Sequence, residues 1–133
     1  MDGSLQPRKL FYLWVPVIFY GVFVFFMSSF SFHFSLFQTA EKNNGDKLAH
    51  VVEYSVLGFL LARALWHHSI FWRSARRVFW AALILGALYG VSDEFHQRFV
   101  PERDSSVFDL TADSLGVALG AWICIRKKKK SYA

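Results

Sequence analysis

Four long apolar segments constrain this chain more than any other feature of its sequence. They span about residues 10–30, 47–66, 78–95 and 107–125. Each has roughly the twenty residues that a helix needs to cross a hydrocarbon core about 30 Å thick. With 54% hydrophobic and 19% aromatic residues, a water-soluble fold of this size would expose much of its apolar surface. The sequence therefore predicts an all-α integral membrane bundle of four transmembrane helices.

The length predicts a single domain. Outside the four segments, 133 residues leave no stretch from which a second core could be built. The first segment is longer than the apolar region of a cleaved signal peptide, about 7–15 residues, and is bulky throughout, so we expect it to be a retained helix. The single cysteine, Cys124, excludes an internal disulfide and a multi-cysteine metal site. We therefore interpret residues 1–133 as one transmembrane domain.

The net charge of +5 comes from short basic blocks beside the apolar segments. This pattern is typical of topology signals and of contacts with anionic lipid, and it argues against nucleic acid as a partner. Four spans place both termini and the 67–77 loop on one side with ten Lys and Arg, and leave four on the other side. The positive-inside rule then predicts that both termini are cytoplasmic. The five tryptophans near predicted span ends are typical of an aromatic belt.

Polar residues from three segments fall at the same predicted depth, toward the outer membrane face. Helical spacing places them on one face of each segment. In the third and fourth segments, glycines continue the same face, and small residues let membrane helices approach closely. These faces are Asp46, His50, Glu53, Tyr54 and Leu57; Gly86, Gly90, Asp93, Glu94 and Gln97; and Asp109, Asp113, Gly116 and Gly120. We therefore expect them to line a polar pocket inside the bundle that opens outward.

Ionisable residues inside a span cost about 2.5–3.5 kcal/mol each on insertion scales, so a functional role is the default hypothesis. A structural alternative is that Asp46 and Ser106 only cap helices. Capping does not explain His50 or Asp113, which lie at least one turn inside their segments. The candidate ligand-binding residues are Asp46, Lys47, His50, Tyr54, Glu94, Gln97, Arg103, Asp109 and Asp113.

Three kinds of chemistry stay open for this pocket. Carboxylates and imidazoles could hold a divalent metal, with His50, Asp93, Glu94 and His96 as candidate ligands. Lys47 and Arg103 could hold a phosphate or a carboxylate. An imidazole beside a carboxylate could do general acid–base work, with catalytic candidates His50, Glu94, Asp109 and Asp113. The sequence contains no H-E-x-x-H, no Gly-rich phosphate loop and no G-x-S-x-G, so it predicts a site without a reaction.

The polar motifs also carry a family resemblance. They are Asp46-Lys47-x-x-His50-x-x-x-Tyr54-x-x-Leu57-Gly58, Ser92-Asp93-Glu94-x-x-Gln97, and Pro101-x-Arg103-x-x-Ser106-x-x-Asp109-x-x-x-Asp113-x-x-Gly116-x-x-x-Gly120. From about Ser28 to Gly120 the chain resembles the VanZ-like family of small bacterial membrane proteins, named for a member linked to teicoplanin (glycopeptide) resistance. The chain departs from that family at Asp113, where the family usually has Asn. The resemblance implies a multi-pass protein of the bacterial cytoplasmic (inner) membrane, and it implies no mechanism.

Two classes of function follow from the pocket and the resemblance. The first is a non-enzymatic envelope protein whose outer pocket binds a lipid headgroup, a lipid-linked cell-wall precursor or a glycopeptide, and which could confer glycopeptide tolerance. The second is an intramembrane enzyme that hydrolyses or transfers a phosphorylated or acylated lipid group, with or without a metal. The lack of a recognisable nucleophile–base–orienter set favours the first class. A metal between His50 and the carboxylates would favour the second.

Overall fold

The computed structural model describes residues 7–29, 45–68, 74–101 and 106–131. Within these ranges the chain forms four helices: α1 (Pro7–Ser28), α3 (Gly45–Trp66), α4 (Ala75–Gln97) and α5 (Val107–Ser131). All four are long and apolar enough to cross a membrane. The predicted all-α fold with four transmembrane helices is confirmed, and the chain is a multi-pass membrane protein.

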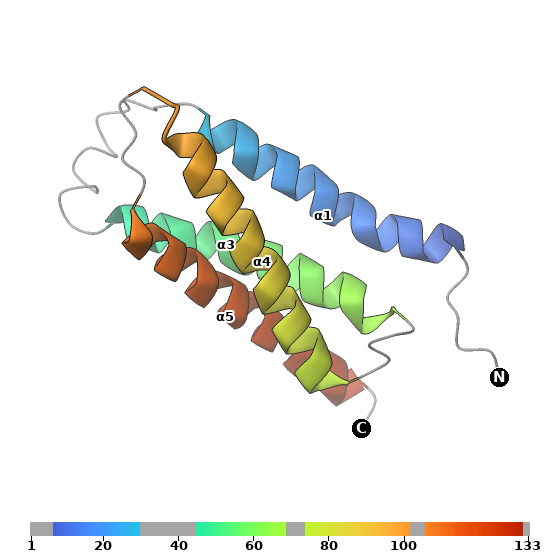
Figure 1. Cartoon of the computed structure of the whole chain (residues 1–133). Helices are drawn as coiled ribbons and strands as arrows, with labels where there is room; N and C mark the ends of the chain where they lie inside the picture. The colour runs from blue at the N-terminus through green and yellow to red at the C-terminus, as the bar shows by residue number, and fades with distance from the viewer. Residues whose placement is uncertain (1–6, 30–44, 69–73, 102–105, 132–133) are drawn as a thin grey trace.

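Successive helices run in opposite directions, so the N- and C-termini lie at the same end of the bundle (Figure 1). The opposite end collects the C-terminal ends of α1 and α4 and the N-terminal ends of α3 and α5. We call this second end, which includes Ser28, Lys47, Gln97 and Val107, the polar end. This arrangement matters for function because it brings the polar turns of the helices together.

All four helices extend beyond their predicted bounds, α4 and α5 most. α4 starts at Ala75 and so includes Arg76 and Arg77, and α5 continues through the basic tail to Ser131. Lys and Arg are good helix formers, and their positive charge is favourable at a helix C-terminus, which explains the longer α5. Pro16 lies inside α1 without ending it.

The closest helix pair is α3 with α5. A Cβ atom added at Gly58 or Gly120 would overlap the backbone of the facing helix, and one at Gly116 would lie 2.5 Å from the carbonyl oxygen of Val51. Glycine is therefore needed at this crossing, because only a missing side chain lets the two backbones come so near. The predicted inward orientation of the α5 glycine face is thus observed.

α1 covers one side of α3 and α4 and is held in part by two tyrosine hydroxyls. Tyr20 donates to the carbonyl oxygen of Glu53 at 3.0 Å, and Tyr89 of α4 donates to the carbonyl oxygen of Gly21 at 2.6 Å. The rest of α1 exposes large apolar side chains, which a bilayer would cover. They include Phe11, Ile18, Phe19, Val22 and Phe26.

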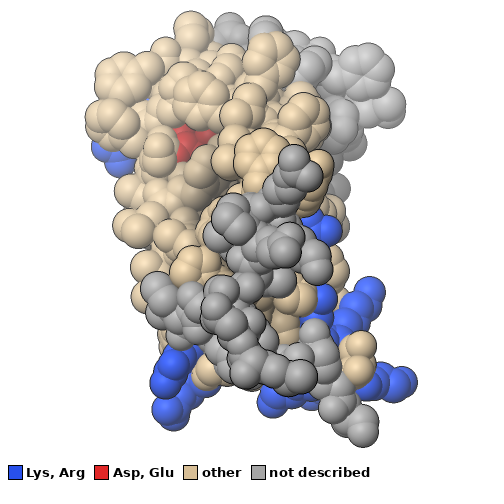
Figure 2. Space-filling model, turned by 90° about the vertical axis from the view of Figure 1, so that its right-hand side faces the viewer, with Lys and Arg blue, Asp and Glu red and all other residues tan. Residues whose placement is uncertain are grey.

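Charged residues are segregated along the bundle. Figure 2 shows Lys and Arg gathered mainly around the end that carries the termini, while acidic atoms show as a small area framed by other residues toward the opposite end. This distribution agrees with the basic asymmetry of the sequence, and the cytoplasmic location of the termini stays a prediction. One tryptophan departs from the expected aromatic belt: Trp66 is only 3% exposed and packs inside the bundle.

Candidate functional site

Buried polar side chains of the described residues gather at the polar end. They come from the last residue of α1, the second turn of α3, the last turns of α4 and the first turns of α5. The remaining buried core is mainly apolar. These buried polar residues are Ser28, His50, Asp93, Glu94, Gln97, Asp109 and Asp113.

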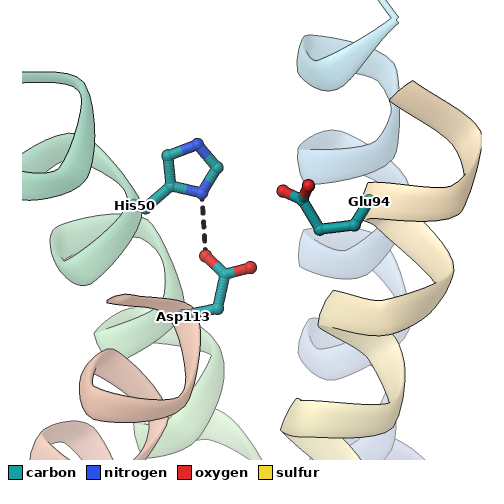
Figure 3. A group of neighbouring side chains, drawn as sticks. All are labelled: His50, Glu94 and Asp113. Carbon is teal, nitrogen blue, oxygen red and sulfur yellow. Dashed lines mark hydrogen bonds and ion pairs between the residues drawn. The ribbon is translucent and has the colours of Figure 1, made fainter. Parts of the chain in front are cut away.

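Three of these side chains, each from a different helix, converge at the centre. His50 Nδ1 and Asp113 Oδ1 are 2.8 Å apart, and Glu94 of α4 points toward this pair (Figure 3). One donor atom from each residue lies within 4.8 Å of the others. The three residues are 0–8% exposed. We call His50, Glu94 and Asp113 the three-helix cluster.

Two carboxylate oxygens of the three-helix cluster lack a hydrogen-bond donor in the part of the chain that the structure describes. Glu94 Oε2 accepts from the backbone N–H of Ser106 at 3.0 Å. Glu94 Oε1 and Asp113 Oδ2 are buried, and neither has a hydrogen-bond partner among the described residues. Gly90 borders one of them, since a Cβ atom added there would lie 3.2 Å from Asp113 Oδ2. Buried acceptors without donors are costly, so the described residues leave these two oxygens unsatisfied.

Asp93, the neighbour of Glu94 in sequence, has the opposite environment. Its Oδ1 accepts from the Ser28 hydroxyl at 2.6 Å. Its Oδ2 accepts from the Tyr54 hydroxyl at 3.3 Å and from Gln97 Nε2 at 3.1 Å. These four residues, the Asp93 network, join α1, α3 and α4 and leave both carboxylate oxygens of Asp93 satisfied.

A third polar contact lies nearer to the helix ends. Lys47 Nζ is 3.0 Å from Asp109 Oδ1, and the two side chains are 40% and 6% exposed. Ser106 caps α5, because its hydroxyl accepts from the backbone N–H of Phe108 at 3.1 Å. The capping role considered for Ser106 is therefore observed, together with its bond to Glu94.

The residues proposed from the sequence as metal ligands lie in three different environments. His50 and Glu94 lie together with Asp113. Asp93 belongs to the Asp93 network, and His96 Nε2 lies 3.0 Å from the Ser29 hydroxyl, with its ring 4.2 Å from that of Phe25. The structure thus groups His50 and Glu94 with a carboxylate that the sequence-derived metal set did not include.

Two predicted ligand-binding residues cannot be placed. Arg103 and the side chain of Asp46 lie outside the described residues. The other predicted members all lie at the polar end: Lys47, His50, Tyr54, Glu94, Gln97, Asp109 and Asp113.

A cavity of about 320 Å³ lies beside the cluster, between α4 and α5. Glu94, Arg98 and Ser106 form its polar wall. Its other lining residues are apolar: Val91, Phe95, Val107 and Leu110. The sequence reasoning did not assign Arg98 or Ser28 to the site. The signal that was present is their position, since both lie at helix ends that the four-span topology brings to the polar end.

The comparison with protein families gives one result. The family model described as VanZ/LLP1 matches residues 4–128. No curated protein and no solved structure gives a match to this chain. Since the match spans all four helices except the last residues of α5, the chain belongs to the VanZ/LLP1 family.

Proposed function

We propose that this membrane protein binds an anionic lipid headgroup at the polar end of its bundle, on the outer side of the bacterial cytoplasmic membrane. The ligand is a phospholipid or a lipid-linked cell-wall precursor, which share a phosphate next to an apolar tail. Through this binding the protein confers tolerance to glycopeptide antibiotics, as the relation to VanZ-like proteins suggests.

The cavity between α4 and α5 is the observation that carries the proposal. One wall is polar, with Glu94, Arg98 and Ser106, and the rest is apolar. The neighbouring apolar residues Phe95 and Val107 are 60% and 81% exposed on the helix surfaces. A lipid suits such a surface, because its headgroup would contact the polar wall while its tail stays beside side chains that already face the bilayer.

Cationic groups near the cavity would select an anionic headgroup. Arg98 lines the cavity, and its planar guanidinium can bind a phosphate with two parallel hydrogen bonds. Lys47 lies at the same end of the bundle, in contact with Asp109. Arg103 belongs to the short segment between α4 and α5, so it is a further candidate for phosphate binding.

The proposal can be tested by native mass spectrometry of the full chain in detergent. We expect phosphatidylglycerol to be retained in preference to phosphatidylcholine with the same acyl chains. Arg98→Gln should weaken phosphatidylglycerol binding at least about ten-fold, because one charge-assisted contact contributes about 1.5–3 kcal/mol. Leu110→Trp should weaken it similarly by filling the cavity.

Matched variants control for general effects of charge and bulk. Arg77→Gln removes an arginine at the opposite end, and Leu115→Trp adds bulk at a residue of α5 that is 63% exposed. Both should bind phosphatidylglycerol like the wild type. Equal retention of both lipids by the wild type, or equal losses in test and control variants, would refute the proposal.

Two substitutions of Arg103 test whether its guanidinium contacts the phosphate. If its guanidinium holds the phosphate through two bonds, Arg103→Lys should lose nearly as much binding as Arg103→Ala, since an ammonium cannot reproduce the bidentate geometry. If Arg103→Lys binds phosphatidylglycerol as well as the wild type, the guanidinium has no special role in binding.

The contact between His50 and Asp113 favours a second candidate function, an intramembrane enzyme that hydrolyses or transfers a phosphorylated or acylated lipid group. An imidazole 2.8 Å from a carboxylate is oriented as a general base requires. An enzyme of this class would convert its lipid over many turnovers, and His50→Asn would stop the conversion. A binding protein would retain the lipid unchanged.

A further inference from the structure

The three-helix cluster has the composition of a metal site. It combines one imidazole, from His50, with two carboxylates, from Glu94 and Asp113, and each comes from a different helix. Figure 3 shows the three side chains directed toward a common centre. A set of ligands spread over three packed helices is held by the fold itself, as in metal sites built inside helical bundles.

The unpartnered oxygens provide a second, independent observation. Glu94 Oε1 and Asp113 Oδ2 are buried and have no donor among the described residues, although both residues are at least 92% buried. The adjacent Asp93 shows that this fold can fully satisfy a buried carboxylate, because its two oxygens accept three hydrogen bonds. The two unsatisfied oxygens therefore mark a place where a positively charged ligand fits.

Charge balance favours a divalent cation at this place. Two ionised carboxylates with a neutral imidazole carry a charge of −2, which a divalent cation cancels. A proton on His50 would cancel only half of it. Buried charges are tolerated when they are paired or coordinate a metal, so a divalent ion would balance both carboxylates in their ionised form.

We propose that His50, Glu94 and Asp113 bind a divalent transition-metal ion, with Zn²⁺ as the representative case. Imidazole nitrogen with carboxylate oxygen suits Zn²⁺ and its neighbours, whereas Mg²⁺ prefers oxygen ligands alone. One donor atom of each residue lies within 4.8 Å of the others. Zinc bonds of about 2.0–2.2 Å would draw these atoms closer together. Three protein ligands leave a coordination position open, as in catalytic rather than structural zinc sites.

The metal site does not depend on the proposed lipid. The metal site is supported by the donor atoms of the three-helix cluster and by their burial. This support would remain if the cavity bound another molecule. If the lipid does bind, the cation removes the repulsion between Glu94, which lines the cavity, and an anionic headgroup.

The test is direct metal binding by the full chain without lipid ligand. The protein is purified through a tag that lacks histidine, stripped with EDTA, and titrated with Zn²⁺ against a chromogenic chelator. We expect about one Zn²⁺ per chain. Glu94→Gln, Asp113→Asn and His50→Asn should each lower the Zn²⁺ affinity at least about ten-fold. Mg²⁺ at the same concentrations should not compete.

Neighbouring residues of the same chemical type supply matched controls. Asp93→Asn alters the carboxylate next to Glu94, and His96→Asn alters an imidazole bonded to Ser29. Asp93→Asn also weakens contacts between α1, α3 and α4, so its folding is first checked by size exclusion and His96→Asn is the primary control. Both folded variants should keep the wild-type Zn²⁺ affinity. Glu94→Gln is the key variant, because a glutamine oxygen can still accept from Ser106 and the fold is then retained.

Two results would overturn the site: Zn²⁺ binding by the wild type no stronger than that of the triple variant, or equal loss of Zn²⁺ in the His96→Asn control. Equal competition by Mg²⁺ would contradict the imidazole-containing donor set. No lipid ligand is added in this assay, so a lack of Zn²⁺ binding would not refute the lipid proposal. The mass-spectrometry assay tests that proposal separately.

Discussion

At the scale of single residues, Asp93 and Glu94 differ more than their adjacent positions suggest. Asp93 is 3% exposed and accepts three hydrogen bonds from residues of three helices. Glu94 is 8% exposed, and one of its oxygens has no donor among the described residues. The first carboxylate holds helices together, whereas the second is the one that we propose as a metal ligand.

This difference predicts that replacing the Asp93 carboxylate by an amide destabilises the protein, whereas the same change at Glu94 does not. Asp93→Asn should destabilise the protein by about 2 kcal/mol, because an amide NH₂ would face donors that then lose their acceptor. Glu94→Gln should leave stability unchanged or raise it slightly, since it keeps the bond to Ser106 and removes a buried charge. Unfolding of the EDTA-treated protein in mixed micelles measures both. Greater destabilisation by Glu94→Gln than by Asp93→Asn would reverse the assigned roles.

At the scale of elements, the crossing of α3 and α5 positions the three-helix cluster. His50 and Asp113 come from these two helices, and their contact requires close backbones. Gly116 and Gly120 lie one and two turns below Asp113 on α5 and face the backbone of α3. The glycines therefore serve the site as well as the packing.

Replacing one glycine at the crossing should separate the helices. Gly120→Ala places a methyl group on the backbone of Ser55, and such overpacking costs about 1–3 kcal/mol. Gly21→Ala is the matched control, because its methyl group would meet only Tyr89 ring atoms at 3.7 Å and beyond, an ordinary contact. Both substitutions replace a glycine by alanine inside a helix, so they gain the same helix propensity and differ only in their contacts. Thermal unfolding should show a lower midpoint for Gly120→Ala alone; equal midpoints would contradict the close packing.

At the scale of the whole molecule, the orientation in the membrane decides which compartment the site faces. Both termini lie at one end of the bundle (Figure 1), and the buried polar residues of the site lie in the helix turns at the other end. The basic residues gather mainly at the end with the termini. From the positive-inside rule we predict that this end is cytoplasmic and that the site faces outward.

Cysteine labelling of intact cells tests this orientation. The only native cysteine, Cys124, is buried and can be replaced by Ala. In that background, Asn44→Cys should react with a membrane-impermeant maleimide, whereas Arg73→Cys should react only after the cells are lysed. The reverse pattern would place the site at the cytoplasmic face and exclude an outer envelope ligand.

The sequence by itself determined the fold class and the end of the bundle at which the polar residues gather. Apolar segments of about twenty residues must satisfy their backbone hydrogen bonds internally, so they become helices in a membrane, and short connections make neighbours antiparallel. Helical spacing also placed His50, Tyr54, Glu94, Gln97 and Asp113 on inward faces, and each is buried in the structure.

Only the tertiary structure decided which polar residues meet. Asp93 and Glu94 are adjacent on α4, so helical spacing alone cannot say which one turns toward α1 and which toward α5. The rotation of α4 about its axis decides this, and that rotation depends on packing of all its neighbours. The same rotation removed Asp93 and His96 from the expected metal set and brought Glu94 to His50 and Asp113.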